Sequence, residues 1–340
     1  MKIARCDVYS YRLPLTMPLP VADRMLVRRD GLALHLVAET GHEGWGDIAP
    51  LPGFSRESLA EAQQQALALA RRTVGRAREP DDPRLNDLCP SVRFGFDSAW
   101  MMLGADAQNT STFRQSALLY GDTEHCLELV RSAIKKKFHT FKLKVGRGRM
   151  EEDAERIRRI QAALPGEAEL RLDANRAWTL EQARALAHQL PEFKPAYIEE
   201  PLADPAQLSA FHEETGWNLA LDETLRGYRP EDDLPAIKGV VAWVIKPTLV
   251  GPLDDTREWQ SRAHREGLSA VISSSFESGL GIRMLGEIAS RDPDVAAGLD
   301  TYRYLAEDVL SARLDFDEAF IDLHEARNIQ VNPARLNLLT

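Results

Sequence analysis

Short apolar runs, spaced at nearly even intervals, restrict the folds that this chain can adopt. Their C-terminal ends fall at residues 144, 173, 199, 222, 246, 273 and 298. Each interval matches the length of one strand followed by one helix. With an earlier strand near residues 116–120, these units predict an α/β fold, a (β/α)8-type barrel over residues 111–305.

A doubly wound open sheet is the alternative fold, but its dinucleotide-binding fingerprint is missing. That fingerprint needs three glycines in a fixed pattern after a strand. Gly146 and Gly148 are followed by Glu151 where the third glycine would stand. The pair at residues 279 and 281 fails in the same way, because residue 284 is a methionine. The barrel is therefore preferred.

The two ends of the chain follow a different pattern from the barrel region. Residues 3–14 and 32–38 alternate like strands, and helical periodicity follows from Ser55 and again over about residues 94–103. Strands followed by helices predict an α+β capping domain over residues 1–110. Residues 306–340 lack the barrel pattern and are predicted to pack back on this cap.

Composition limits the partners of the chain. It has 340 residues, a net charge of -10 and 28% charged residues, which argues against a nucleic-acid partner. No apolar run of about 18 residues predicts a membrane span, and no signal peptide is apparent. Cys6, Cys89 and Cys126 form no pairwise motif, which fits reduced thiols and a cytoplasmic location. The sequence does not indicate an oligomeric state.

Acidic side chains end three successive strands of the predicted barrel. Asp173, Glu199 and Asp222 would meet at the barrel mouth, where the C-terminal ends of the strands converge. Close carboxylates repel one another unless a cation lies between them. Oxygen ligands without His or Cys suit Mg2+, or alternatively Mn2+. The three acids are therefore predicted to bind a divalent metal ion.

Lysines flank this predicted metal site on both sides. Lys142 and Lys144 alternate with Phe141 and Leu143, so both ammonium groups point to one face of a strand, and Lys246 ends a later strand. Taken alone, Lys-x-Lys also fits a half-solvated strand. A lysine acts as a base near pH 7 only if its pKa falls by about 3 units. With the acids, the lysines predict proton abstraction beside the carboxylate of a small-molecule substrate.

These residues resemble the enolase superfamily, and longer strings resemble its o-succinylbenzoate synthases, enzymes of menaquinone biosynthesis. The strings are residues 46–55 (GDIAPLPGFS), 171–178 (RLDANRAW), 244–249 (VIKPTL), 273–281 (SSSFESGLG) and 298–301 (GLDT). The resemblance implies a capping domain that closes over the barrel. Residues 21–29 and 51–54 would be lid segments, although ordinary surface loops fit them nearly as well.

The resemblance also implies a reaction, the dehydration of 2-succinyl-6-hydroxy-2,4-cyclohexadiene-1-carboxylate to 2-succinylbenzoate. Lys144 would remove the proton beside the carboxylate and return it to the departing hydroxide in a syn elimination. Lys246 would stabilise the enediolate, and Lys142 would lower the pKa of Lys144. The implied Mg2+ ligands are Asp173, Glu199 and Asp222.

Three further residues are assigned to substrate binding on the same grounds. Arg171 shares a strand face with Asp173, so it is expected to point inward, towards Lys144 or a carboxylate. A plain ion pair is an equal alternative for it. Ser273 and Gly298 end the last two strands, where the family binds the succinyl carboxylate and leaves room for the ring.

Two rival functions are open at this point. Racemisation of N-acylamino acids or epimerisation of dipeptides needs the same metal and two opposed lysines. A barrel that only binds a carboxylate and Mg2+, without turnover, is less favoured.

Overall fold

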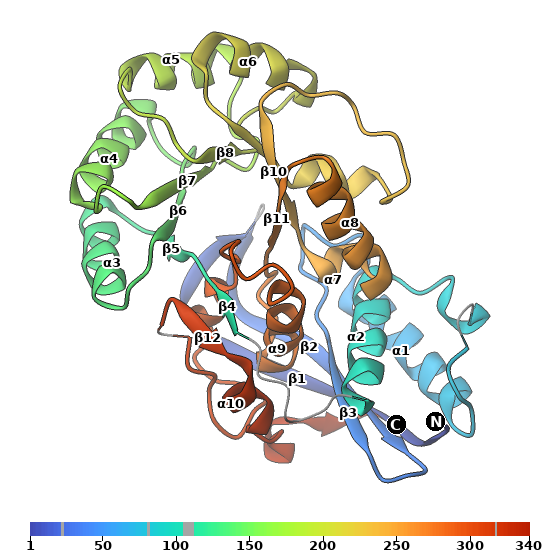
Figure 1. Cartoon of the computed structure of the whole chain (residues 1–340). Helices are drawn as coiled ribbons and strands as arrows, with labels where there is room; N and C mark the ends of the chain where they lie inside the picture. Colours follow the sequence, from blue (N-terminus) through green and yellow to red (C-terminus); the bar gives the residue numbers. More distant parts are fainter. Residues whose placement is uncertain (22–23, 80–81, 105–111, 317) are drawn as a thin grey trace.

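The two ends of the chain build an antiparallel sheet. The computed structural model describes residues 1–21, 24–79, 82–104, 112–316 and 318–340. The sheet consists of β13 (Asn337–Leu338), β1 (Ile3–Val21), β2 (Arg24–Ala38) and β3 (Glu43–Ile48), in that order. β1 and β2 form a long hairpin, and both chain ends lie at this side of the molecule (Figure 1).

Two helices cover one face of this sheet, and we call the sheet and these helices the cap. They are α1 (Leu59–Thr73) and α2 (Pro90–Leu103). β3 approaches α2 so closely that a Cβ on Gly46 would lie 1.8 Å from the carbonyl oxygen of Gly95. The equivalent distance from Gly44 to the carbonyl oxygen of Ala99 would be 2.0 Å. Glycine is required at both positions because the two backbones touch.

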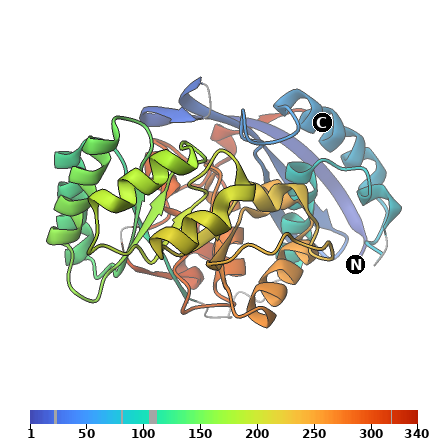
Figure 2. The same cartoon turned by 90° about the horizontal axis from the view of Figure 1, so that it is seen from above.

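A parallel sheet forms most of the barrel. Its order is β11 (Ser269–Ile272), β10 (Val240–Ile245), β9 (Leu219–Leu221), β8 (Tyr197–Glu199), β7 (Glu169–Asp173), β6 (Thr140–Lys144) and β5 (Ala117–Leu119). The helices around it are α3 (Thr123–Lys135), α4 (Met150–Ala163), α5 (Leu180–Gln189), α6 (Leu208–Thr215), α7 (Pro247–Val250), α8 (Leu253–Arg265) and α9 (Gly279–Ala289). Figure 2 shows the cap lying across one end of this barrel. The predicted fold class is confirmed.

The barrel departs from a regular repeat at two points. The predicted strand over residues 296–299 is reduced to single bridges, between Gln115 and Ala297 and between Ser273 and Gly298, which still close the sheet. β9 is followed by a short 3₁₀ helix, η3 (Glu223–Gly227), in place of an α-helix. η3 is tied to the cap instead, because Arg56 donates a 2.6 Å hydrogen bond to the carbonyl of Arg226.

The C-terminal segment contacts both parts of the molecule. β12 (Phe320–Asp322) pairs with β4 (Thr112–Arg114), and α10 (Leu323–Asn328) packs on α9. Further along, β13 pairs with β1 of the cap. The division of the chain at residues 110 and 305 stays a prediction, and residue 110 lies outside the described residues.

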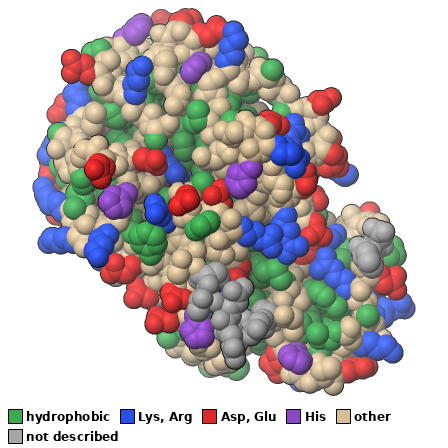
Figure 3. All heavy atoms as spheres, in the orientation of Figure 1, with side chains coloured by type: hydrophobic (Ala, Val, Ile, Leu, Met, Phe, Trp, Pro, Cys, Tyr) green, Lys and Arg blue, Asp and Glu red, His purple; other side chains and the backbone are tan. Residues whose placement is uncertain are grey.

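The length of the helices and one view of the surface describe the outside of the molecule. In the described ranges, no helix is both long and apolar enough to cross a bilayer. Acidic and basic side chains are interspersed over the face in Figure 3, without a large basic patch. Such mixing is typical of a surface in contact with water.

The contact between β3 and α2 yields a stability prediction. Gly46→Ala places a methyl group against the α2 backbone and should lower the free energy of unfolding by about 1–3 kcal/mol. Gly166→Ala is the control, because a Cβ there meets nothing within 4 Å. Urea unfolding measures both variants. Equal midpoints for the two would contradict the described packing.

Candidate active site

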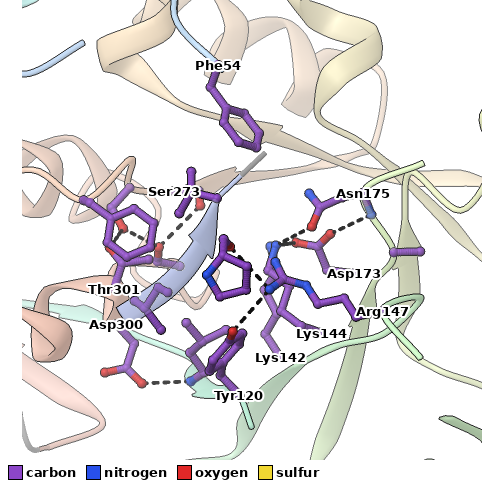
Figure 4. A pocket seen from close by; sticks show the side chains of 18 of the residues that line it. Phe54, Tyr120, Lys142, Lys144, Arg147, Asp173, Asn175, Ser273, Asp300 and Thr301 are labelled. Atoms are coloured by element: carbon purple, nitrogen blue, oxygen red, sulfur yellow. Dashed lines mark hydrogen bonds and ion pairs between the residues drawn. The ribbon is translucent and has the colours of Figure 1, made fainter. Parts of the chain in front are cut away.

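A cavity of about 590 Å³ lies between the barrel mouth and the cap. The cap contributes Leu19, Leu51 and Phe54 to its wall, and Figure 4 shows Phe54 pointing in from above. The barrel contributes the ends of its strands, among them Lys142, Lys144, Asp173, Lys246, Ser273 and Gly298. Six of the nine predicted site residues therefore line one cavity, and Arg171, Glu199 and Asp222 are not part of its lining.

Strand register brings the charged residues to one level. Lys144 pairs with Asp173 across β6 and β7, and Asp173 pairs with Glu199 across β7 and β8. Paired residues of parallel strands point to the same side of the sheet. Phe141 and Leu143 point the other way and are fully buried among the helices. The alternation seen in the sequence therefore fixes which side chains face the cavity.

The lysines of β6 are paired with buried carboxylates. Nζ of Lys142 lies 2.7 Å from Oδ2 of Asp173 and 2.6 Å from Oε2 of Glu199. Nζ of Lys144 lies 2.6 Å from the same oxygen of Asp173 and donates to Oδ1 of Asn175 at 2.9 Å. Figure 4 shows these side chains converging on Asp173. One carboxylate oxygen is thus shared by two ammonium groups.

A second cationic group contributes from the far side of the barrel. Lys246 follows β10 and forms an ion pair with Asp222, which also accepts a 3.1 Å hydrogen bond from Arg226. β7, β8 and β9 separate β10 from β6 in the sheet. In a closed barrel of this size, Lys246 therefore faces Lys144 across the cavity.

The two lysines of β6 have opposite pKa shifts. Burial lowers the pKa of Lys144, and the neighbouring Lys142 ammonium adds to this effect against the attraction of Asp173. Burial also acts on Lys142, but contact with two carboxylates, Asp173 and Glu199, outweighs it and raises that pKa well above its ordinary value. Lys144 is consequently the lysine of this strand that loses its proton more readily.

The acids are chemically suited to a hard divalent cation. Asp173, Glu199 and Asp222 are almost completely buried and offer only oxygen donors. Burial and the charge of Asp173 raise the pKa of Glu199 to about 8. Within the described residues, its buried Oε1 atom has no hydrogen-bond partner. A bound cation would satisfy that oxygen and favour the ionised carboxylate.

The acids do not form a ready-made metal cage. No group of three or more His, Cys, Asp or Glu side chains is close enough for one in the described ranges. Lysine ammonium groups lie against each of the three acids instead. The metal ligand set of Asp173, Glu199 and Asp222 therefore stays a prediction.

The residues predicted to bind substrate separate into two groups. Ser273 and Gly298 line the cavity, and a Cβ on Gly298 would come within 3.1 Å of the Ser273 hydroxyl. Arg171 does not line it: its guanidinium donates a 2.8 Å hydrogen bond to the carbonyl of Ala296 and lies over the Tyr197 ring. It stands two residues before Asp173, which places it about 6.6 Å deeper along the strand.

Several cavity residues were missed by the sequence reasoning. Asn175 accepts from Lys144 and donates to Glu223 at 3.3 Å, and its position two residues after Asp173 was the available signal. Arg147 lies over the Tyr120 ring at the mouth, and Asp300 and Thr301 line the opposite wall (Figure 4). These contacts depend on loops whose course the strand pattern does not predict.

The second acid of the Glu199-Glu200 pair has a structural role. Its carboxylate accepts hydrogen bonds from the backbone N–H groups of Asp222 and Thr224, at 3.0 and 2.6 Å. Arg176 pairs with the same group at 2.9 Å. Glu200 therefore fixes the backbone that carries Asp222, while Glu199 faces the interior.

Two family models cover most of the chain. "MenC, N-terminal domain" matches residues 3–103, and "Enolase C-terminal domain-like" matches residues 125–327. Solved structures share the fold. The dipeptide epimerase of Enterococcus faecalis V583, complexed with Mg and a dipeptide, has a TM-score of 0.81 at 18% identity and covers 99% of this chain and 100% of its own.

Curated proteins of higher sequence identity include o-succinylbenzoate synthases. The o-succinylbenzoate synthase of Enterobacter sp. (strain 638) is 39% identical over 87% of this chain and 90% of its own length, and that of Escherichia coli (strain SMS-3-5 / SECEC) has the same identity and coverage. A solved synthase from Thermosynechococcus elongatus BP-1, complexed with Mg, is 26% identical, with a TM-score of 0.71 over 91% of this chain and 96% of its own. The chain therefore belongs to the o-succinylbenzoate synthase family, within the enolase superfamily.

Proposed function

We propose that this chain is an o-succinylbenzoate synthase, a hydro-lyase of menaquinone biosynthesis. It would convert 2-succinyl-6-hydroxy-2,4-cyclohexadiene-1-carboxylate into 2-succinylbenzoate and water. The opposed pair Lys144 and Lys246, within a cavity walled by buried carboxylates, is the observation that carries the proposal. The names of the curated relatives support the choice of substrate.

Lys144 is proposed as the base. It would take the proton from the ring carbon that bears the carboxylate, and the electron pair would form an enediolate. The same ammonium group would then return the proton to the hydroxyl on the neighbouring carbon, which leaves as water and makes the ring aromatic. The lowered pKa of Lys144 supports this role, because only a neutral amine accepts a proton.

Lys246 and the acids are proposed to stabilise the enediolate. From the opposite wall, the Lys246 ammonium would lie near the ring and balance the developing negative charge. Asp173, Glu199 and Asp222 would hold Mg2+, with Mn2+ as an alternative. When bound there, such a cation supplies positive charge for the substrate carboxylate and its enediolate.

The remaining walls are proposed to hold the rest of the substrate. Ser273 offers a hydroxyl for the succinyl carboxylate, and the absence of a side chain on Gly298 leaves room beside it. Leu51 and Phe54 of the cap would cover the ring and exclude water. Arg171 is not included, because its guanidinium is engaged deeper in the barrel.

Racemisation of an N-acylamino acid is the second candidate activity. Two lysines on opposite sides of one cavity could exchange an α-proton from either face, which favours this chemistry as well. The epimerases that share the fold have under 20% identity, whereas the synthases reach 39%. We therefore place dehydration first.

A cytoplasmic location fits this proposal. Cys6, Cys89 and Cys126 are free thiols in the described structure, and burial raises the pKa of each. Thiols kept reduced and unreactive are typical of cytoplasmic proteins.

The first prediction on activity concerns metal dependence. Purified protein with the cyclohexadiene substrate and Mg2+ should show the ultraviolet absorbance change of aromatisation. A chelator should stop it, and added Mg2+ should restore it, because the carboxylate-rich site would lose its cation. Folded protein that holds Mg2+ but gives no aromatic product would turn attention to α-proton exchange in deuterated N-acylamino acids.

Removal of either opposed lysine should abolish turnover. Lys144→Ala removes the base and Lys246→Ala removes a stabilising charge, so each should lower kcat by roughly three orders of magnitude. Lys238→Ala is the matched control, because Lys238 is exposed and forms an ion pair with Glu213 on the surface. Circular dichroism checks the fold of each variant. Near wild-type activity of Lys144→Ala would show that another group is the base.

The proposed metal ligands can be tested without catalysis. Glu199→Gln should weaken Mg2+ binding at least about tenfold in calorimetry, because an amide oxygen carries no charge to match the cation. Glu213→Gln makes the same substitution on the surface and should leave the affinity unchanged. Equal affinities of the two variants would remove Glu199 from the ligand set.

A further inference from the structure

Arg29 of β2 is a buried guanidinium held by backbone carbonyl groups. Its exposed fraction is 1%, and it donates to the carbonyls of Pro50 at 2.8 Å, Phe276 at 3.0 Å and Asp30 at 3.2 Å. It also contacts the carbonyls of Ala49 and Ser275. In the described part of the chain it forms no ion pair. A buried charge is costly unless its donors are satisfied, as they are here. The charge of Arg29 also counteracts the burial that raises the pKa of Asp47 and of Glu277.

The acceptors on one side of Arg29 belong to the cap. Ala49 and Pro50 directly precede residues 51–55, a turn that is closed by its own hydrogen bonds. In this turn, the N–H groups of Phe54 and Ser55 donate to the carbonyl of Leu51 at 3.0 and 2.8 Å. Leu51 and Phe54 line the cavity. Arg29 therefore fixes the backbone directly before the turn that carries Leu51 and Phe54 into the cavity wall.

The acceptors on the other side belong to the barrel. Ser275 and Phe276 follow Ser273 and Ser274, and three of these four residues line the cavity. Phe276 has a φ of 61°, in the left-handed region that non-glycine residues rarely adopt. Such a conformation persists only where its surroundings hold it in place. The hydrogen bond from Nε of Arg29 to the carbonyl of Phe276 is one such restraint.

We propose that Arg29 is a positioning residue that fixes the cap wall of the cavity relative to the β11 wall. One rigid guanidinium joins the segment at residues 49–55 to the segment at residues 273–276 and sets the distance between them. Its expected effect on substrate binding rests on the proposed function. Its expected effect on the structure of the two segments is independent of that function.

A neighbouring contact between cap and barrel provides a matched control. The Tyr11 hydroxyl donates to Asp47 at 2.7 Å, and Asp47 accepts from the backbone and the hydroxyl of Ser278 at 2.8 and 2.9 Å. None of these three side chains is part of the cavity lining described. Tyr11→Phe thus weakens the same interface without releasing either wall. Arg28→Met removes a guanidinium one position away, where it is exposed and pairs with Asp30.

Amide hydrogen exchange of the full chain tests the positioning role directly. Arg29→Met should lower the protection of residues 49–55 and 273–277 by about tenfold or more, because four to five carbonyls lose their donor. Arg29→Lys should give an intermediate loss, since an ammonium group has three donors in place of five. Arg28→Met and Tyr11→Phe should leave both segments close to wild type. If Arg29→Met does not fold, the comparison of amide exchange between Arg29→Lys and Tyr11→Phe tests the proposal in its place.

Kinetics then test the consequence for catalysis. Well below the unfolding temperature, Arg29→Met should raise KM roughly tenfold with a smaller change in kcat, because both walls bind the ground and transition states alike. Tyr11→Phe should lower the melting temperature and keep KM. The proposal is overturned if amide protection of the two segments is unchanged in both Arg29 variants. It is also overturned if Tyr11→Phe loses as much protection there as the Arg29 variants do. Turnover missing in the wild type overturns the proposed function only, because the exchange result stands independently.

Discussion

The pairing of buried carboxylates with lysine ammonium groups is the interaction on which the barrel mouth depends. Asp173, Glu199 and Asp222 lie out of water, and each contacts at least one lysine. Deleting one member would leave a buried charge uncompensated, which typically destabilises a protein by about 3–5 kcal/mol. The arrangement also gives the two lysines of β6 different pKa values. Contact with two acids raises the pKa of Lys142, whereas burial and repulsion by the Lys142 ammonium group lower the pKa of Lys144.

The barrel and the cap divide the work at this site. Strand ends supply the charged groups, because strands are rigid and their register fixes neighbouring side chains at one level. The cap supplies apolar and loop residues that close the space above them. The contacts of Arg29 and of Asp47 with the β11 segment join the two parts. The charged residues of the site and the apolar residues that cover them therefore come from separate stretches of the sequence.

The strand ends could be predicted from sequence because two periodicities coincide there. The spacing of the βα units located the mouth, and the alternation within β6 oriented Lys142 and Lys144. Alternation gives the face of a strand but not the depth along it. Arg171 was therefore expected to point towards Lys144 or a carboxylate of the site, whereas it stands deeper and lies 3.6 Å from Glu169, as in the alternative of a plain ion pair. The strand expected at residues 296–299 is only a pair of bridges, and the apolar run in the sequence does not reveal how many hydrogen bonds it makes. Arg29 was predicted only as the end of the segment 21–29, and its contacts could not be foreseen, because its acceptors are carbonyls, which every residue carries.

The pairing of β13 with β1 has a consequence for synthesis on the ribosome. The N–H of Val8 and the hydroxyl of Thr340 are hydrogen-bonded although they are 332 positions apart in the chain. An emerging chain can form the β1–β2 hairpin early, but Tyr9 and Ser10 of β1 stay unpaired on this edge until residues 337–338 have been synthesised. Exposed strand edges pair readily with other strands, so this edge of the cap is open to incorrect pairing during synthesis. Closure of such a distant contact is also expected to be among the slowest steps in folding.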